Sequence, residues 1–136
     1  MRLGAIVIDS DNIEKLADFY ADLLGWVKTE QINNDEKWLI VAKADYSETP
    51  LVFQQNLDYQ SPVWPSNSQQ QQQMQHLDFY VRMDEYQQKI EHAIKCGASK
   101  ANSQFSKDWQ VMIDPSGHPF CIIPIPNEIY EQRYSK

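Results

Sequence analysis

The stretch DPSGHPFCII, residues 114–123, determines which structure is predicted for the end of the chain. It joins a turn signal, a histidine, a cysteine and an apolar run. Asp-Pro-Ser-Gly predicts a turn in which Asp114 bonds its own backbone and Gly117 adopts a positive φ. The proline after His118 restricts that residue to extended geometry. On the strand that follows, His118 and Cys121 are an odd number of positions apart, so their side chains point to opposite faces. A catalytic dyad of these two residues is therefore not expected.

Working outward from this stretch, hydrophobic periodicity divides the chain into two halves with the same order of elements, strand–helix–strand–strand–strand. Between the halves, residues 56–74 are rich in Gln, Pro, Ser and Asn and are predicted to be irregular. We expect strands at residues 3–9, 26–32, 37–44, 49–55, 74–83, 98–105, 108–114 and 119–125, helices near 12–24 and 84–96, and a helical turn at 126–134.

The first predicted helix has clear ends. Ser10 or Asp11 can cap its N-terminus, with Glu14 completing a capping box, and Gly25 ends it in the left-handed conformation. In the second helix Gly97 has the same role. The predicted core-facing residues of the two helices are Ile13, Leu16, Phe19, Tyr20, Leu23 and Leu24, and then Tyr86, Ile90, Ala93 and Ile94.

The two glycines that end the helices lie 72 positions apart (97 − 25), and this offset aligns Gly4 with His76. An internal repeat of this length predicts two copies of one supersecondary unit. The expected fold is α+β, with two βαβββ modules paired around a central cavity. Within a single domain spanning 1–136, module one covers about 1–56, the linker about 57–74, module two about 75–126 and the C-terminal tail 127–136.

Charge and cysteine content exclude several classes of function. The formal net charge is −7 and the pI about 4.8, so phosphate backbones and anionic membranes are not expected partners. The N-terminal apolar run is too short for a signal sequence or a membrane span. The two cysteines, Cys96 and Cys121, do not form a disulfide framework, which favours a reducing, cytoplasmic setting.

The combination of LGAIVIDSDNIEKLADFYADLLGW, LVFQQNLDYQSPVWP, QHLDFYV and DPSGHPFCII resembles the vicinal oxygen chelate superfamily, in its glyoxalase-like and bleomycin-resistance-like branch, which also includes dioxygenases. The resemblance covers nearly the whole chain. It implies paired βαβββ modules around a small-molecule cavity. In the metalloenzymes of this superfamily, inward side chains of the first and last strands of each module hold one divalent metal.

Alternation along the first strand of module two places His76, Asp78 and Tyr80 on one face. Leu77, Phe79 and Val81 occupy the other face and are expected to pack on the helix, so the polar set faces the cavity. In module one the offset of 72 places Gly4 at the position of His76, and then Ile6 and Ile8 further along that same face.

The resemblance assigns the metal-ligand positions to His76 and Cys121 in module two, and to Gly4 and a residue near Val52 or Gln54 in module one. Glycine has no ligand atom, and an amide oxygen is a poor ligand for a transition metal. The sequence therefore predicts no complete metal site and no cofactor, with well under one equivalent of metal in purified protein. A divalent metal on His76, Cys121 and Gln54 stays an alternative.

The expected ligand-binding residues are Gln54, Trp64, His76, Asp78, Tyr80 and Cys121. Trp64 stands between two prolines and is expected to cover the edge of the pocket or a dimer interface. Trp38 and Trp109 are predicted at symmetry-related places. His76, Asp78 and Tyr80 are also the candidate catalytic residues, because a neighbouring carboxylate makes a histidine more basic. The alternative is that they line a polar pocket wall.

Three classes of function remain open. The first is a protein that binds a small organic molecule without metal. The second is a metal-dependent lyase, isomerase or dioxygenase centred on His76. The third is a structural or interaction role in which side chains close the cavity. A homodimer is left open.

Overall fold

The computed structural model describes the backbone of residues 1–135 and every side chain among them except that of Asn33. The chain divides into two compact units, residues Met1–Gln60 and Ser61–Lys136. Each unit has the α+β order βαβββ predicted from the sequence. The prediction that the modules enclose a cavity concerns their mutual placement and stays a prediction.

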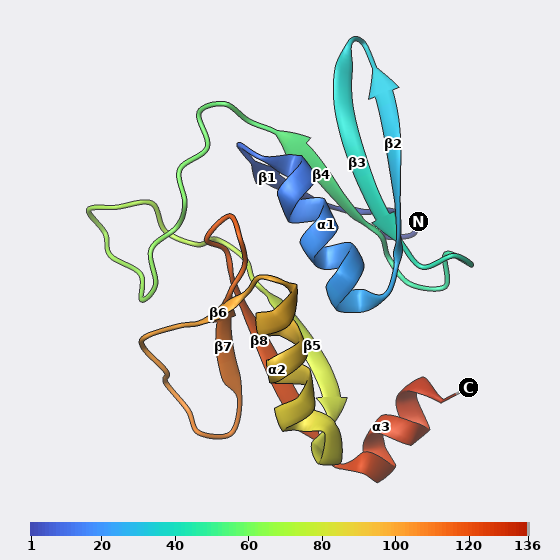
Figure 1. Cartoon of the computed structure of the whole chain (residues 1–136), viewed down its shortest axis with the longest axis vertical. Helices are drawn as coiled ribbons and strands as arrows, with labels where there is room; N and C mark the ends of the chain where they lie inside the picture. The colour runs from blue at the N-terminus through green and yellow to red at the C-terminus, as the bar shows by residue number, and fades with distance from the viewer. Residues whose placement is uncertain (136) are drawn as a thin grey trace. The chain divides into compact units, whose positions relative to one another are not determined.

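The first unit consists of one four-stranded sheet and one helix (Figure 1). Its sheet has the order β1-β4-β3-β2, in which β1 and β4 are parallel and the other pairs antiparallel. The elements are β1 (Ile6–Ser10), α1 (Ile13–Leu24), β2 (Val27–Asn33), β3 (Glu36–Ala42) and β4 (Leu51–Gln55).

Helix α1 covers one face of this sheet with its apolar side (Figure 1). Tyr20 stacks on Phe53 of β4, with ring centroids 5.7 Å apart. The buried residues of the helix are Ile13, Leu16, Ala17, Phe19 and Tyr20. These spacings are those of an amphipathic helix, so the predicted helix and its apolar face are confirmed.

The ends of α1 confirm one prediction and correct another. Gly25 adopts φ 67°, the left-handed cap expected of it. At the N-terminus the cap is Asn12, whose side chain accepts from the Lys15 backbone N–H at 3.2 Å. The predicted caps lie one and two residues too early. Ser10 is instead buried at the end of β1 and accepts a hydrogen bond from the Asn12 N–H at 2.9 Å.

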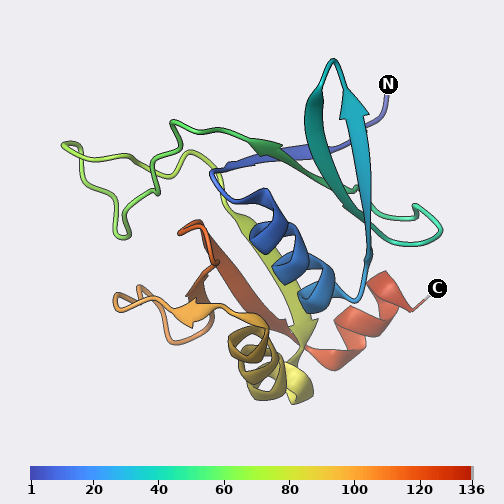
Figure 2. The same ribbon diagram turned by 45° about the horizontal axis from the view of Figure 1, so that its top comes forward.

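The second unit repeats the topology, with the sheet order β5-β8-β7-β6. Its first and last strands, β5 and β8, are parallel, and α2 lies across one face of the sheet (Figure 2). The elements are β5 (Leu77–Arg82), the 3-10 turn η1 (Met83–Glu85), α2 (Tyr86–Cys96), β6 (Ser99–Lys100), β7 (Gln110–Ile113), β8 (Pro119–Ile125) and α3 (Asn127–Tyr134).

Two details of the second helix and the tail differ from the sequence analysis. Ile90 and Ala93 are buried as predicted, but Ile94 is 44% exposed, because the helix turns only a narrow apolar stripe toward its sheet. The C-terminal segment forms a helix of eight residues, longer than the single turn expected.

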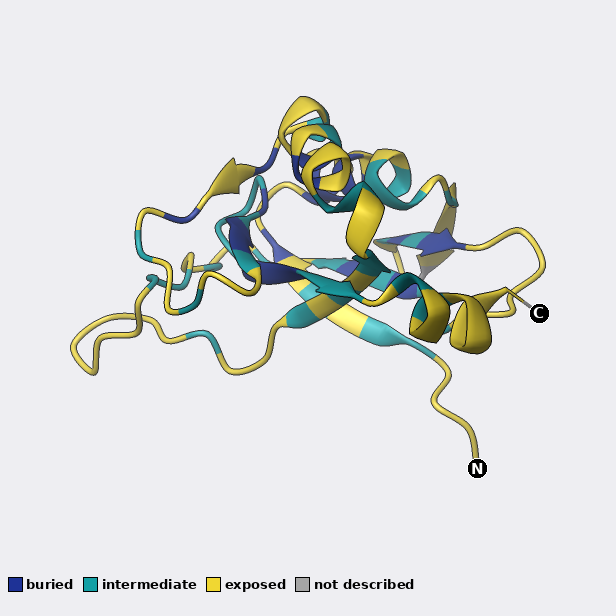
Figure 3. Ribbon diagram, turned by 90° about the horizontal axis from the view of Figure 1, so that it is seen from below, coloured by how far each residue is buried: buried dark blue, intermediate teal, exposed yellow. Residues whose placement is uncertain are grey.

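The register of β1 corrects the alignment of the two halves. Ile6 and Ile8 lie level with the buried Leu51 and Phe53, so they belong to the face that packs on α1. Figure 3 shows exposed and intermediate colours alternating along this strand, which leads from the N-terminus. The prediction that Gly4, Ile6 and Ile8 share the face of His76 is therefore wrong by one residue.

The one-residue error in aligning the two halves is caused by the turn η1. The first strands of the two units begin at Ile6 and Leu77, both on the helix side of their sheets, so these strands align at an offset of 71 (77 − 6). The helix-ending glycines align at 72, because the second unit has one more residue between strand and helix end. The structural equivalent of His76 is thus Ala5, and that of Asp78 is Val7.

Candidate functional site

We use the term helix-distal face for the side of each sheet turned away from its own α1 or α2. In the second unit this face follows from the alternation of β5, in which Leu77 and Phe79 are turned to the helix side and Asp78 and Tyr80 are exposed. The predicted separation of polar and apolar residues on β5 is confirmed. The helix-distal face of the second unit carries His76, Asp78, Tyr80, Arg82, Val111, Ile113, Cys121, Ile123 and Ile125.

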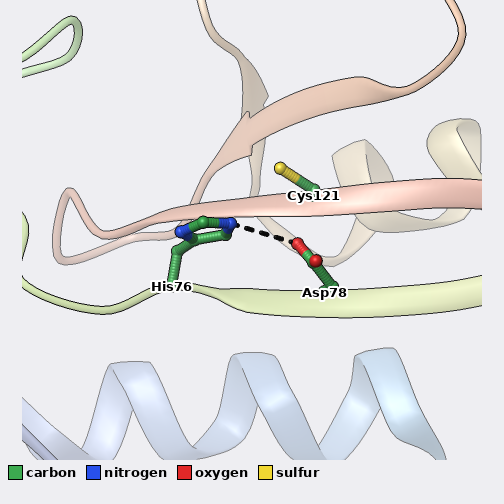
Figure 4. A group of neighbouring side chains, drawn as sticks. All are labelled: His76, Asp78 and Cys121. Atoms are coloured by element: carbon green, nitrogen blue, oxygen red, sulfur yellow. Dashed lines mark ion pairs between the residues drawn. The ribbon is translucent and has the colours of Figure 1, made fainter.

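Three chemically active side chains meet on this face (Figure 4). His76 immediately precedes β5, Asp78 lies on it, and Cys121 is directly opposite Asp78 on β8. His76 Nε2 is 3.2 Å from Asp78 Oδ1, and the two side chains are 42% and 39% exposed. Cys121 is buried. The ligand atoms of the three residues all lie within 4.8 Å of one another.

The environment keeps Cys121 in its thiol form. Burial, together with the charge of Asp78 and a hydrogen bond to it, raises the pKa of the Cys121 thiol to about 11. A thiol at neutral pH donates a hydrogen bond and is a weak nucleophile. Cys121 therefore supports Asp78 as a neutral donor and is unsuited to nucleophilic catalysis.

Trp64 lies over the buried part of this face. It packs against a cluster formed by Ala101, Val111 and Cys121. Its indole Nε1 donates to the Ser103 carbonyl at 2.9 Å, and its ring contacts Phe105 with centroids 5.1 Å apart. These contacts fix a loop tryptophan next to the cysteine of the candidate site.

The turn DPSG forms as predicted. The Ser116 and His118 backbone N–H groups donate to Asp114 Oδ1 at 2.9 and 3.0 Å, and Gly117 has φ 92°. Gly117 is needed for a second reason, because a Cβ there would lie 2.9 Å from the side chain of Ser61.

Sequence reasoning missed one feature of this turn. The His118 ring Nδ1 lies 2.8 Å from Asp114 Oδ2, and the Asp114 side chain is fully buried. The turn DPSG could have indicated this contact, because it closes a hairpin. In that hairpin the Asp114 N–H donates to the His118 carbonyl, which brings residues 114 and 118 next to each other. His118 and Asp114 therefore stabilise the start of β8, next to the site.

The remaining predicted site residue, Gln54, lies in the first unit. Gln54 is on the helix-distal face of β4, opposite Asp9 and Trp38 in the strand register. Whether Gln54 shares a pocket with His76 stays a prediction. His92 lies on α2, where its Nε2 is 3.7 Å from Cys96 Sγ.

The two tryptophans predicted on the third strands differ in their position relative to those strands. Trp38 is opposite Gln54 on β4, and Trp109 immediately precedes β7, where the register of β7 and β8 continues to Ile123. Trp38 therefore lies within its third strand as predicted, whereas Trp109 lies just before β7, one residue outside the strand.

The superfamily's four metal-ligand positions do not fit a metal in this chain. In the strand registers the first-unit positions fall on Ala5 and Val52, which have no ligand atom, and the second-unit positions fall on His76 and Cys121. Asp78 adds a carboxylate that is not among the superfamily's ligand positions. His76, Asp78 and Cys121 form a different three-donor group, confined to one unit.

Among the described residues, none of the helices has the length and hydropathy needed to cross a bilayer.

Solved structures of similar fold cover nearly the whole chain. A glyoxalase/bleomycin resistance protein/dioxygenase family enzyme from Burkholderia phytofirmans has a TM-score of 0.66 at 16% identity, over 92% of this chain and 99% of that one. A mutant fosfomycin resistance protein, FosX, from Listeria monocytogenes, complexed with Mn(II) and a dihydroxypropylphosphonic acid, has a TM-score of 0.65 at 13% identity, over 98% and 97%. At these identities the likeness shows the fold.

A glyoxalase family protein from Enterococcus faecalis has a TM-score of 0.64 at 16% identity, over 90% of this chain and 96% of that one. No curated protein matches the chain. The family model that matches is described as a glyoxalase-like domain and spans residues 5–123. With the βαβββ repeat and the sheet order already described, this match places the chain in the glyoxalase-like domain family of the vicinal oxygen chelate superfamily.

Proposed function

We propose that the helix-distal face of the second unit binds a small organic molecule, and that it does so without the superfamily's complete metal site. The observation that carries the proposal is the meeting of His76, Asp78 and Cys121, in which a half-exposed imidazole–carboxylate pair lies beside a buried thiol. Polar groups that converge at the edge of an apolar surface are typical of small-molecule sites.

The surroundings of the pair fit this function. Tyr80, 43% exposed, lies two residues further along the same face of β5. Trp64 and Phe105 contribute aromatic surface above the cluster that contains Cys121. A ligand with a flat apolar part and one or two polar groups would match both features.

The test is a screen of small aromatic compounds by tryptophan fluorescence and by two-dimensional NMR. For a compound that binds, His76→Ala or Tyr80→Ala should weaken binding by about 1 kcal/mol or more, the scale of a lost hydrogen bond. His92→Ala is the matched control, because His92 lies on α2, which covers the other side of the sheet. An equal loss in all three variants would contradict the proposal.

A second candidate is a metal-dependent lyase, isomerase or dioxygenase centred on His76. The observation in its favour is that one nitrogen, one oxygen and one sulfur donor lie within 4.8 Å of one another. This mixed donor set suits zinc, which takes histidine, carboxylate and thiolate ligands at about 2.0–2.3 Å. The metal would have to displace the Cys121 proton, which the raised pKa opposes.

Zinc titration followed by calorimetry and metal analysis tests this candidate. It requires about one equivalent of zinc to be retained by the unmodified chain and lost in both His76→Ala and Cys121→Ser. Retention of zinc in Cys121→Ser, or its loss in His92→Ala, would place the metal elsewhere.

A further inference from the structure

We infer that the ligand of the second unit's helix-distal face is an organic cation, whose ammonium or amidinium group meets the carboxylate of Asp78. This inference rests on the proposed function and adds the chemical class of the ligand. It follows from where the charged groups of the second unit lie, taken one element at a time.

Asp78 has acceptor capacity left for a ligand. An ionised carboxylate offers about four acceptor positions on its two oxygens. His76 lies next to one of them, at 3.2 Å from Oδ1, and the Cys121 thiol hydrogen-bonds the same side chain. Because the Asp78 side chain is 39% exposed, a further donor can reach it from solvent.

The cation nearest along the strand is already paired. Arg82 follows Asp78 by four residues, at the far end of β5. Its guanidinium contacts Asp84, with Nε 3.1 Å from Oδ1, and also pairs with Glu131 of α3. Two carboxylates thus hold Arg82 at that end, where it does not neutralise Asp78.

The lysines of α2 and β6 belong to the other side of the sheet. Lys89 and Lys95 lie on α2. Lys100 of β6 is opposite Met112, which is fully buried on the helix side with Phe120. Around Asp78 the helix-distal face therefore presents a histidine, a thiol and aromatic rings, and the one cation of β5, Arg82 at its far end, is held by Asp84 and Glu131.

This arrangement favours one sign of ligand charge. A phosphonate or carboxylate placed near Asp78 would be repelled, and an ammonium or amidinium would form a charge-assisted hydrogen bond with it. Tyr80 and the Trp64–Phe105 pair also favour a cation, because aromatic faces attract positive charge. The net charge of −7 adds attraction at longer range.

Three probes of one shape and different charge test the inference on the full chain after treatment with chelator. They are benzamidine (cation), benzamide (neutral) and phenylphosphonate (anion), each followed by two-dimensional NMR of the His76, Asp78 and Cys121 signals. We expect benzamidine to bind at least about tenfold more tightly than the other two. Its binding should weaken as the ionic strength rises, and that of benzamide should not.

Two variants show whether the preference for benzamidine depends on Asp78. In Asp78→Asn the preference for benzamidine over benzamide should disappear. In Asp35→Asn it should persist, since Asp35 is an exposed residue of the first unit's hairpin and this change removes the same charge.

The outcomes separate this inference from the proposed function. Phenylphosphonate binding as tightly as benzamidine, or a preference for benzamidine that survives in Asp78→Asn, would overturn the assignment of a cation and leave the proposed function standing. Failure of all three probes to shift the site signals would count against the proposed function and the cation together.

Discussion

On the helix-distal face of the first unit, β1 carries Val7, and at the equivalent place of the second unit β5 carries Asp78. Likewise Ala5 corresponds to His76 and Val52 to Cys121. The helix-facing positions differ little, since Leu51 and Phe53 of β4 correspond to Phe120 and Ile122 of β8, and all four are buried. The repeated topology thus preserves the packing of helix on sheet in both units, whereas the meeting of a histidine, a carboxylate and a thiol is found in the second unit.

The largest effect is expected where the two units agree. Phe53→Ala and Phe120→Ala should each lower the free energy of unfolding by about 3–5 kcal/mol, because each leaves a cavity between sheet and helix. Urea denaturation followed by circular dichroism measures both. Val7→Ala on the helix-distal face, where Val7 is 52% exposed, is the control and should change the free energy by no more than about 0.5 kcal/mol. A loss below about 1 kcal/mol for either phenylalanine would contradict the shared packing of helix on sheet in the two units.

The element order of both units could be predicted from the sequence because it depends on local signals. The helix of residues 13–24 has five buried residues at helical spacing, and Gly25 and Gly97 end their helices as expected. The alternation along β5 was equally clear, because Leu77 and Phe79 separate the polar residues.

The alignment of the halves could not be obtained in the same way. The two glycines mark the helix ends, and η1 adds one residue between strand and helix in the second unit. A shift of one residue moves a side chain to the other face of a strand. The pairing of His118 with Asp114 was missed for a different reason. Strand alternation describes which face a side chain takes, and this contact closes across a turn.

A pair of glycines, one in the second unit and one in the first, gives a medium effect. Gly117→Ala should destabilise the second unit by about 1–3 kcal/mol, because φ is 92° there and the new Cβ would meet Ser61 at 2.9 Å. Gly4→Ala should be neutral within about 0.5 kcal/mol, since a Cβ at Gly4 meets nothing within 4 Å. Thermal unfolding of the two variants measures the difference. Equal destabilisation would mean that Gly4 has a structural role that its surroundings do not show.

The smallest effect concerns the contact that distinguishes the second unit, between Asp78 and Cys121. Burial and the charge of Asp78 raise the pKa of this thiol to about 11, so at pH 8 little thiolate is present. Asp78→Asn removes the charge and leaves the burial, so the pKa should fall and alkylation by iodoacetamide should accelerate by up to about tenfold, the effect of one pKa unit. Mass spectrometry in a Cys96→Ser background follows Cys121 alone, and Asp35→Asn supplies the control. The rate should rise with pH in every variant, but the rise should begin at lower pH in Asp78→Asn. An unchanged rate in Asp78→Asn would show that burial alone protects the thiol and that the carboxylate acts only on His76.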